Sequence, residues 1–143
     1  MRRSSLVVVL VASLIFLPSC SDEGAEVLSS IENSSWDLQR VETSGSPTIV
    51  IPSSENYTLE FRTSTEVGGV SHCNTYQGSY TLVSPDAISI RSIVSTEIAC
   101  RPPTHDGEFQ QMLAQVKSLK IQGNELQLSN SDHTQMLYFV RSK

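Results

Sequence analysis

Three cysteines and three histidines are the side chains of this chain best suited to nucleophilic or metal chemistry. His72 directly precedes Cys73, so on a strand the two side chains would point to opposite faces, and His72 could not easily deprotonate its neighbour. Cys100 is followed by His105 and Asp106, but two prolines intervene and nothing in the sequence orients the imidazole. Nucleophilic catalysis needs a base that a third group orients. We therefore predict no catalytic residue and a protein that is not an enzyme.

The spacing of possible metal ligands does not indicate a metal site. His72, His105 and His133 lie far apart, and neither the Cys-x-x-Cys nor the His-x-x-x-His spacing occurs. Neighbouring acidic residues such as Asp22 and Glu23 fall in a polar segment, and no glycosidase-like carboxylate pair stands out. We predict three solvated surface histidines, no metal and no cofactor.

The remaining cysteine, Cys20, ends an export signal. Arg2 and Arg3 precede an apolar run from Leu6 to Leu17, which is shorter than the ~20 residues of a membrane-spanning helix. The run ends in Leu-Pro-Ser-Cys20, which resembles the lipobox of bacterial lipoproteins, where the cysteine is acylated and becomes the new N-terminus. The resemblance implies a signal peptide over residues 1–19, a lipid on Cys20 and a place in the bacterial cell envelope. Because serine follows the cysteine, the outer membrane is favoured if the host is Gram-negative.

Lipidation of Cys20 leaves Cys73 and Cys100 as a single possible pair in an exported, oxidising compartment. We predict that they form a disulfide, which would stabilise the fold by ~3 to 4 kcal/mol in the chain-entropy model. The alternative is two buried, unpaired thiols.

The charge of the mature chain argues against nucleic-acid binding. Residues 20–143 hold eight Lys/Arg against fifteen Asp/Glu, a formal net charge of −7, and the basic residues are scattered singly. Anionic lipid would repel such a surface, so membrane contact is expected from the anchor rather than from the fold.

Alternation of apolar and polar residues predicts most of the folded part as strands. Residues 20–34 are polar and read as a flexible tether, leaving one domain over 35–143. In one of the alternating runs, Tyr57, Leu59 and Phe61 share a face. Turn signals, among them Gly68-Gly69, separate the runs. The runs are 36–41, 57–62, 74–83, 87–93, 125–128 and 136–140.

One segment has the helical period instead. Phe109, Met112, Leu113 and Val116 are spaced as the apolar stripe of an amphipathic helix near residues 105–118. The predicted fold is therefore mainly β, a small antiparallel barrel-like or strongly curled sheet with one α-helix.

Seven motifs occur in a fixed order along the chain: Trp36-x-Leu38, Leu59-x-Phe61, Gly68-Gly69, Cys73-Asn74-x-Tyr76-x-Gly78-x-Tyr80, Thr96-x-x-Ala99-Cys100, Glu108-Phe109-x-x-x-Leu113 and Gly123-Asn124-x-Leu126-x-Leu128. This array resembles the META domain family, which includes a bacterial heat-shock protein linked to novobiocin resistance. The resemblance covers roughly residues 35–140.

The resemblance implies a small β-barrel-like fold with one helix, and it brings no established reaction, cofactor or catalytic residue. Two positions depart from the family pattern, with His72 in place of a glycine and Ile98 in place of a methionine. The histidine would require an ordinary φ where a glycine is permissive. We expect Asn74 to bond its own backbone after a turn, and the signature as a whole to maintain the fold.

Three functions compete on this sequence. The first is a non-enzymatic, membrane-anchored envelope protein that acts by binding, in envelope maintenance or stress tolerance, with a protein or a small ligand as possible partner. The second is a small-ligand binder that uses the barrel mouth, and the third is an uncharacterised hydrolase. An apolar cavity open at one barrel end would favour the second, whereas a filled interior would favour the first.

Overall fold

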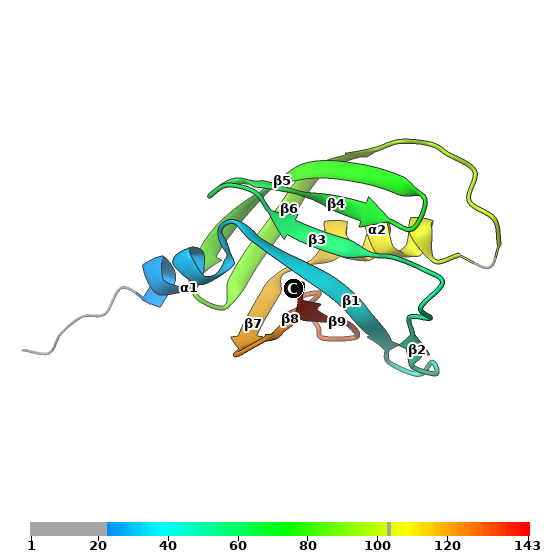
Figure 1. Ribbon diagram of the computed structural model, residues 1–143. Helices are drawn as coiled ribbons and strands as arrows, with labels where there is room; N and C mark the ends of the chain where they lie inside the picture. Colours follow the sequence, from blue (N-terminus) through cyan, green and yellow to red (C-terminus); the bar gives the residue numbers. More distant parts are fainter. Residues whose placement is uncertain (1–22, 103) are drawn as a thin grey trace, which may run out of the picture.

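An antiparallel β-barrel forms the body of the protein in the computed structural model, which describes residues 23–102 and 104–143 (Figure 1). Within these residues eight strands close the barrel, β2 is an extra strand, and two helices accompany them. The mainly β prediction is confirmed, and the barrel is closed. The elements are α1 (Glu23–Ile31), β1 (Ser34–Thr43), β2 (Ile49–Val50), β3 (Thr58–Phe61), β4 (Glu66–Ser71), β5 (Asn74–Ser84), β6 (Ala87–Ser95), α2 (Asp106–Gln115), β7 (Ser118–Gln122), β8 (Glu125–Ser129) and β9 (Gln135–Arg141).

Strand β1 closes the barrel because it pairs on both sides. Trp36 lies opposite Leu59 of β3 on one side, and Leu38 lies opposite Phe139 of β9 on the other. From β3 to β9 each strand pairs antiparallel with the next along the chain, as a meander does. The later part of β1 pairs with β2, which lies outside the closed ring.

Three strands were not predicted: the two-residue β2, and β4 and β7, whose sequences explain why. Gly68-Gly69, expected in a turn, lies inside β4. A Cβ on Gly69 would collide with the backbone carbonyl of Thr58, so this position requires a glycine, whereas a Cβ on Gly68 would meet only the end of the Arg62 side chain. Strand β7 begins at Ser118, where the predicted helix was expected to end, and residues 119–122 were assigned to no element.

Large apolar side chains fill the interior of the barrel. Tyr57, Leu59 and Phe61 are buried, as their shared face predicted. Aromatic rings pack against each other there. The ring centroid of Phe109 in α2 lies 5.2 Å from that of Tyr57 and 5.9 Å from that of Tyr76. The largest fully buried side chains are Trp36, Tyr57, Phe61, Phe109, Phe139, Ile31, Leu59, Ile88, Ile90, Leu113, Leu126 and Leu128.

The tyrosine hydroxyls inside the barrel donate to backbone carbonyls. Tyr76 bonds the carbonyl of Thr58 at 2.7 Å, and Tyr80 bonds that of Thr63 at 2.9 Å. Burial raises the pKa of Tyr76, and it raises the pKa of Tyr80 to about 12. Both hydroxyls are therefore neutral, satisfied core groups.

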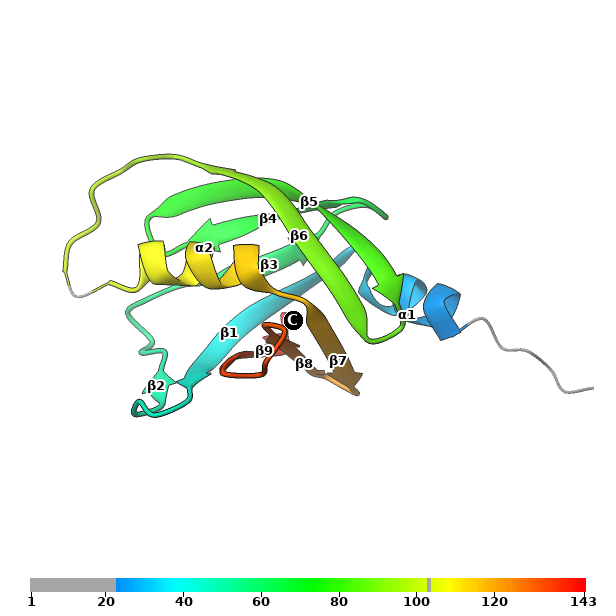
Figure 2. The ribbon, with the colours of Figure 1, turned by 180° about the vertical axis from the view of Figure 1, so that it is seen from behind.

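Helix α2 covers the weakest seam of the barrel. Strands β6 and β7 share a single paired position, Ala87 opposite Ser118, and α2 lies in the chain between these two strands. Its buried face holds Phe109, Met112 and Leu113, which confirms the helix predicted near residues 105–118. Figure 2 shows α2 alongside β6, with β1 on its other side.

A second helix replaces part of the expected tether. Residues 23–31 form α1, in which Ile31 is fully buried and Val27 and Leu28 pack against the core. Nη2 of Arg141 also donates to the carbonyl of Ser30 at 3.0 Å. Val27, Leu28 and Ile31 have the spacing of one helix face, but the segment around them is polar, so the sequence did not predict this helix. No helix in the described residues is long and apolar enough to cross a membrane.

His72, which stands where the family pattern has a glycine, has a backbone conformation that glycine favours. His72 has φ +55° in the turn between β4 and β5, so the expectation of an ordinary φ was wrong. Histidine is among the residues that tolerate the left-handed region, which explains how the turn survives the exchange.

Candidate functional site

One end of the barrel gathers most of the residues singled out in the sequence. A disulfide joins Cys73 in the β4–β5 turn to Cys100 before α2, with the two Cα atoms 5.7 Å apart. The predicted pairing is thus present in the structure. We call this the disulfide end: the β4–β5 turn, residues 95–102 and 104–106, and the start of α2. Cys20 and residues 1–19 lie outside the described residues.

Asn74 holds the disulfide end together through its side-chain amide. Its Oδ1 accepts from the Thr96 hydroxyl and from the backbone N–H of Ile98, each at 2.8 Å. Its Nδ2 donates to the Ile98 carbonyl at 3.1 Å and to Oδ2 of Asp106 at 3.0 Å. The expected bond to its own backbone is replaced by these contacts across the fold. Because the amide is buried and its four bonding positions are used, its role is structural.

Asp106 completes this network at the first turn of α2. Its carboxylate accepts from the hydroxyl of Ser71, from Asn74 and, at 3.1 Å, from Nε2 of Gln110. A carboxylate near a helix N-terminus is favoured by the helix dipole. With three donors around it, Asp106 is a structural anchor for α2.

A buried carboxylate that the sequence did not indicate lies beside this network. The Glu55 side chain is 4 % exposed, and its Oε2 accepts from the Tyr57 hydroxyl at 2.5 Å and contacts Nδ1 of His105 at 3.1 Å. The Tyr57 hydroxyl in turn accepts the backbone N–H of His105 at 2.8 Å. Fifty residues separate Glu55 from His105, so no local spacing could have revealed the pair.

This arrangement lowers the pKa of Glu55. Burial raises the pKa, but the hydrogen bonds from Tyr57 and His105 outweigh the burial and keep the carboxyl ionised. Burial and the adjacent carboxylate raise the pKa of Tyr57. His105 is therefore an oriented imidazole, which corrects the expectation that nothing orients it.

An oriented imidazole can hold and transfer a proton, but the described residues supply no nucleophile to it. The sulfurs of Cys73 and Cys100 are joined to each other in the disulfide. Among the described residues, Glu55 is the one hydrogen-bond partner of the His105 imidazole. His72 stacks on the Tyr57 ring with centroids 6.2 Å apart. His133 lies elsewhere, in the β8–β9 turn, where Nδ1 is 2.8 Å from Oγ of Ser129.

Metal binding has no support in the same region. Across residues 23–102 and 104–143, no three His, Cys, Asp or Glu side chains are grouped so that they could hold a metal ion.

The enclosed space beneath α2 is too small for a ligand, and a more open hollow of about 480 Å³ lies beside it, lined by α2, residues 43–49 and Gln135. The gap between α2 and strands β1 and β2 has a volume of about 10 Å³ and is lined by residues such as Leu38, Val41 and Met112. A volume of that size holds about one water molecule. This part of the barrel mouth is therefore filled rather than open.

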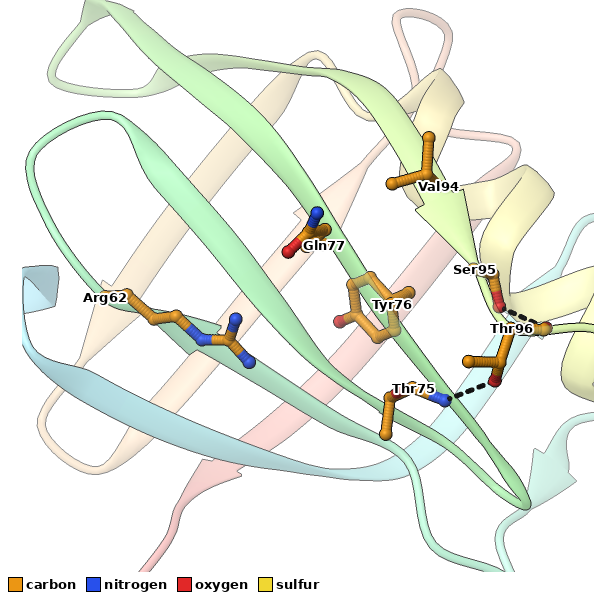
Figure 3. Close-up of a pocket in the computed structure, with 7 residues that line it drawn as sticks. All are labelled: Arg62, Thr75, Tyr76, Gln77, Val94, Ser95 and Thr96. Carbon is orange, nitrogen blue, oxygen red and sulfur yellow. Dashed lines mark hydrogen bonds between the residues drawn. The ribbon is translucent and has the colours of Figure 1, made fainter.

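An open groove lies instead on the outer face of the barrel (Figure 3). It has a volume of about 310 Å³, and a neighbouring hollow of about 290 Å³ shares Arg62, Gln77 and Val94 with it. We call the first of these the outer groove. Its lining residues are Arg62, Thr75, Tyr76, Gln77, Val94, Ser95 and Thr96.

The outer groove combines polar groups with one exposed apolar side chain. Arg62 lies over Gly68 and donates to Oε2 of Glu60 from Nε at 3.1 Å and from Nη2 at 3.0 Å. Val94 is 58 % exposed. The Thr96 hydroxyl accepts the backbone N–H of Thr75 at 3.2 Å, so the residue that follows β6 is tied to β5 beside the groove. Such a lining suits a polar partner that also offers a small apolar contact.

Comparison with known proteins identifies relatives of the whole domain. The model of the META domain family matches residues 29–143. A protein from Burkholderia xenovorans, solved by NMR, has a TM-score of 0.69 and 23% identity, over 96% of this chain and 99% of that one. A DUF4847 family protein from Bacteroides vulgatus, solved by crystallography, has a TM-score of 0.60 and 12% identity, over 82% and 98%. At these identities the two structures are similar in fold. Comparison with curated proteins found no match.

Proposed function

The chain belongs to the META domain family, and on that premise we propose that it is an envelope lipoprotein whose barrel binds a partner on its outer surface. The filled interior carries this proposal. Aromatic and aliphatic side chains occupy the barrel, and the gap beneath α2 has room for about one water. Binding is then left to the outside of the barrel.

Two features support an envelope location. The Leu-Pro-Ser-Cys20 sequence after a short apolar run fits lipid attachment at Cys20, and the Cys73–Cys100 disulfide fits an exported, oxidising compartment. Two or more acyl chains hold a protein durably on a membrane. Envelope maintenance or stress tolerance is the process we propose for it.

The roles of the polar residues support binding rather than catalysis. Asn74 and Asp106 are engaged in anchoring α2, and the sulfurs of Cys73 and Cys100 are joined in a disulfide. The Glu55–His105 pair is the feature that a hydrolase would use, and it has no nucleophile beside it among the described residues.

A small ligand is the second candidate, and the outer groove offers it both polar and apolar contacts. Arg62 and Gln77 offer hydrogen-bond donors there, and Val94 offers an apolar contact. A polar small molecule of modest size fits a hollow of about 310 Å³.

Photo-crosslinking of the lipidated protein in its own envelope tests the proposal. A photoreactive residue is placed at Gln77 in the outer groove, at exposed Lys120 on β7, or at buried Leu126 as the interior control. We expect a discrete crosslinked species from an outer-face position and none from position 126. The absence of crosslinks from both outer positions, with hydrolytic activity that His105→Ala abolishes, would contradict binding and favour the enzyme.

A further inference from the structure

Helix α1 is fixed to the barrel rather than suspended from it. Ile31 is fully buried, Val27 and Leu28 pack against the core, and Arg141 bonds the Ser30 carbonyl. Apolar burial and a charged hydrogen bond both oppose its release. The helix therefore has a defined direction relative to the strands.

The proposed lipid site lies close to the start of this helix. Three peptide steps separate Cys20 from Glu23, and three steps span at most about 11 Å. A spacer of this length cannot let the barrel turn over freely on the membrane. The place where α1 packs on the barrel therefore determines which end of the barrel faces the lipid.

Helix α1 lies at the end of the barrel opposite the disulfide. Figures 1 and 2 both show it beside the far end of β5, and β5 runs from Asn74 at the disulfide end to Ser84. An 11-residue strand is roughly 33 Å long, or about 25 Å along the axis of a barrel with tilted strands. We call this opposite end the α1 end; it carries the β3–β4, β5–β6 and β7–β8 turns.

The charges at the α1 end do not themselves attract an anionic membrane. Glu66, Asp86 and Glu125 are exposed there beside the basic Arg62 and Lys143. Among the described residues of this end, acidic and basic groups are mixed, so no basic cluster there draws the end to lipid. The short spacer and the docked helix must supply the orientation.

We infer that the barrel stands on the membrane with its α1 end at the lipid surface and its disulfide end about 25 Å farther out. The inference rests on the proposed lipidation of Cys20. The α1 end thus contacts the lipid surface. A partner elsewhere in the envelope would contact the disulfide end or the sides of the barrel. The outer groove, between the two, opens sideways.

Energy transfer to acceptor-labelled lipid headgroups tests this orientation. Lipidated protein purified from membranes carries a donor dye, introduced through a non-canonical residue, either at Asn124 in the β7–β8 turn or at Ser54 near Glu55; both positions are exposed. After reconstitution into vesicles, transfer from position 124 should exceed transfer from position 54. Twelve Gly/Ser residues inserted between Asp22 and Glu23 add a span on the order of 20 Å and should make the two efficiencies alike.

Flotation of the vesicles separates the two ways in which the idea can fail. Floated protein with equal transfer from positions 54 and 124 in the unmodified chain overturns the orientation alone. Protein that carries no lipid and stays below the vesicles overturns the proposed function, and the orientation with it.

Discussion

At the scale of single residues, Asn74 shows how a signature residue acts without touching a ligand. Its amide joins the segment around Thr96 and Ile98 to Asp106 at the start of α2. The sequence predicted a structural role for Asn74 but placed its bonds locally. The partners lie 22 to 32 residues away, so only the fold could reveal them.

Asn74→Ala should destabilise the protein by about 2 to 4 kcal/mol, because buried partners of the amide lose their hydrogen bonds. Urea unfolding measures the loss. Thr75→Ala is the matched control, since Thr75 is exposed and bonds Thr96 through its backbone N–H, and it should stay within about 0.5 kcal/mol of wild type. Equal stabilities of the two variants would contradict the structural role.

Glu55 should make stability depend on pH. Its pKa lies below the ordinary 4.5 in the folded protein, so the ionised carboxylate stabilises the fold above the unfolded-state value. That contribution is lost as the pH falls through the folded-state value. Glu55→Gln should therefore cost more stability at about pH 7 than at about pH 3. Denaturant unfolding at both values is the measurement, and a cost that does not change with pH would refute it. Exposed Glu97→Gln is the control.

The disulfide should contribute strongly to stability and little to binding. Cys100→Ser opens a bridge that spans 27 residues, and about 3.5 kcal/mol should be lost in the chain-entropy model. The melting temperature should fall while binding persists below the new transition. Two free thiols in the oxidised, unfolded wild type would disprove the bond, and lost binding at unchanged stability would indicate a reactive cysteine.

At the scale of elements, strands with clean alternation were predictable and those with a special residue were not. The Tyr57–Phe61 run and the helix around Phe109 followed from periodicity. Strand β4 was missed because its two glycines, which make room for Arg62 and Thr58, are also turn signals. Helix α1 was missed because its few apolar residues lie in a polar segment.

Ile31 gives a direct test of α1. Ile31→Ala should destabilise the domain by about 2 to 4 kcal/mol, since the side chain is fully buried. Ser29→Ala, on the exposed side of the same helix, should be close to neutral. If residues 20–34 were a free tether, the Ile31 variant would unfold at the same denaturant concentration as wild type.

At the scale of the whole molecule, the structure shows a closed barrel with a filled core, and we propose that a lipid holds it at the membrane and that it binds on its outside. The candidate site could be predicted only in part. The Cys73–Cys100 pair followed from counting cysteines, whereas Glu55 beside His105 and the outer groove arise from packing between distant strands. The lipid site itself is predicted from the sequence around Cys20 alone.

Mass spectrometry of the protein recovered from host membranes tests the central claim most directly. The account predicts an acylated Cys20 as the first residue, and a Cys20→Ser variant that is neither processed at this position nor held on the membrane. A mature N-terminus at another residue, or a Cys20→Ser variant that is still cleaved and membrane-bound, would contradict it.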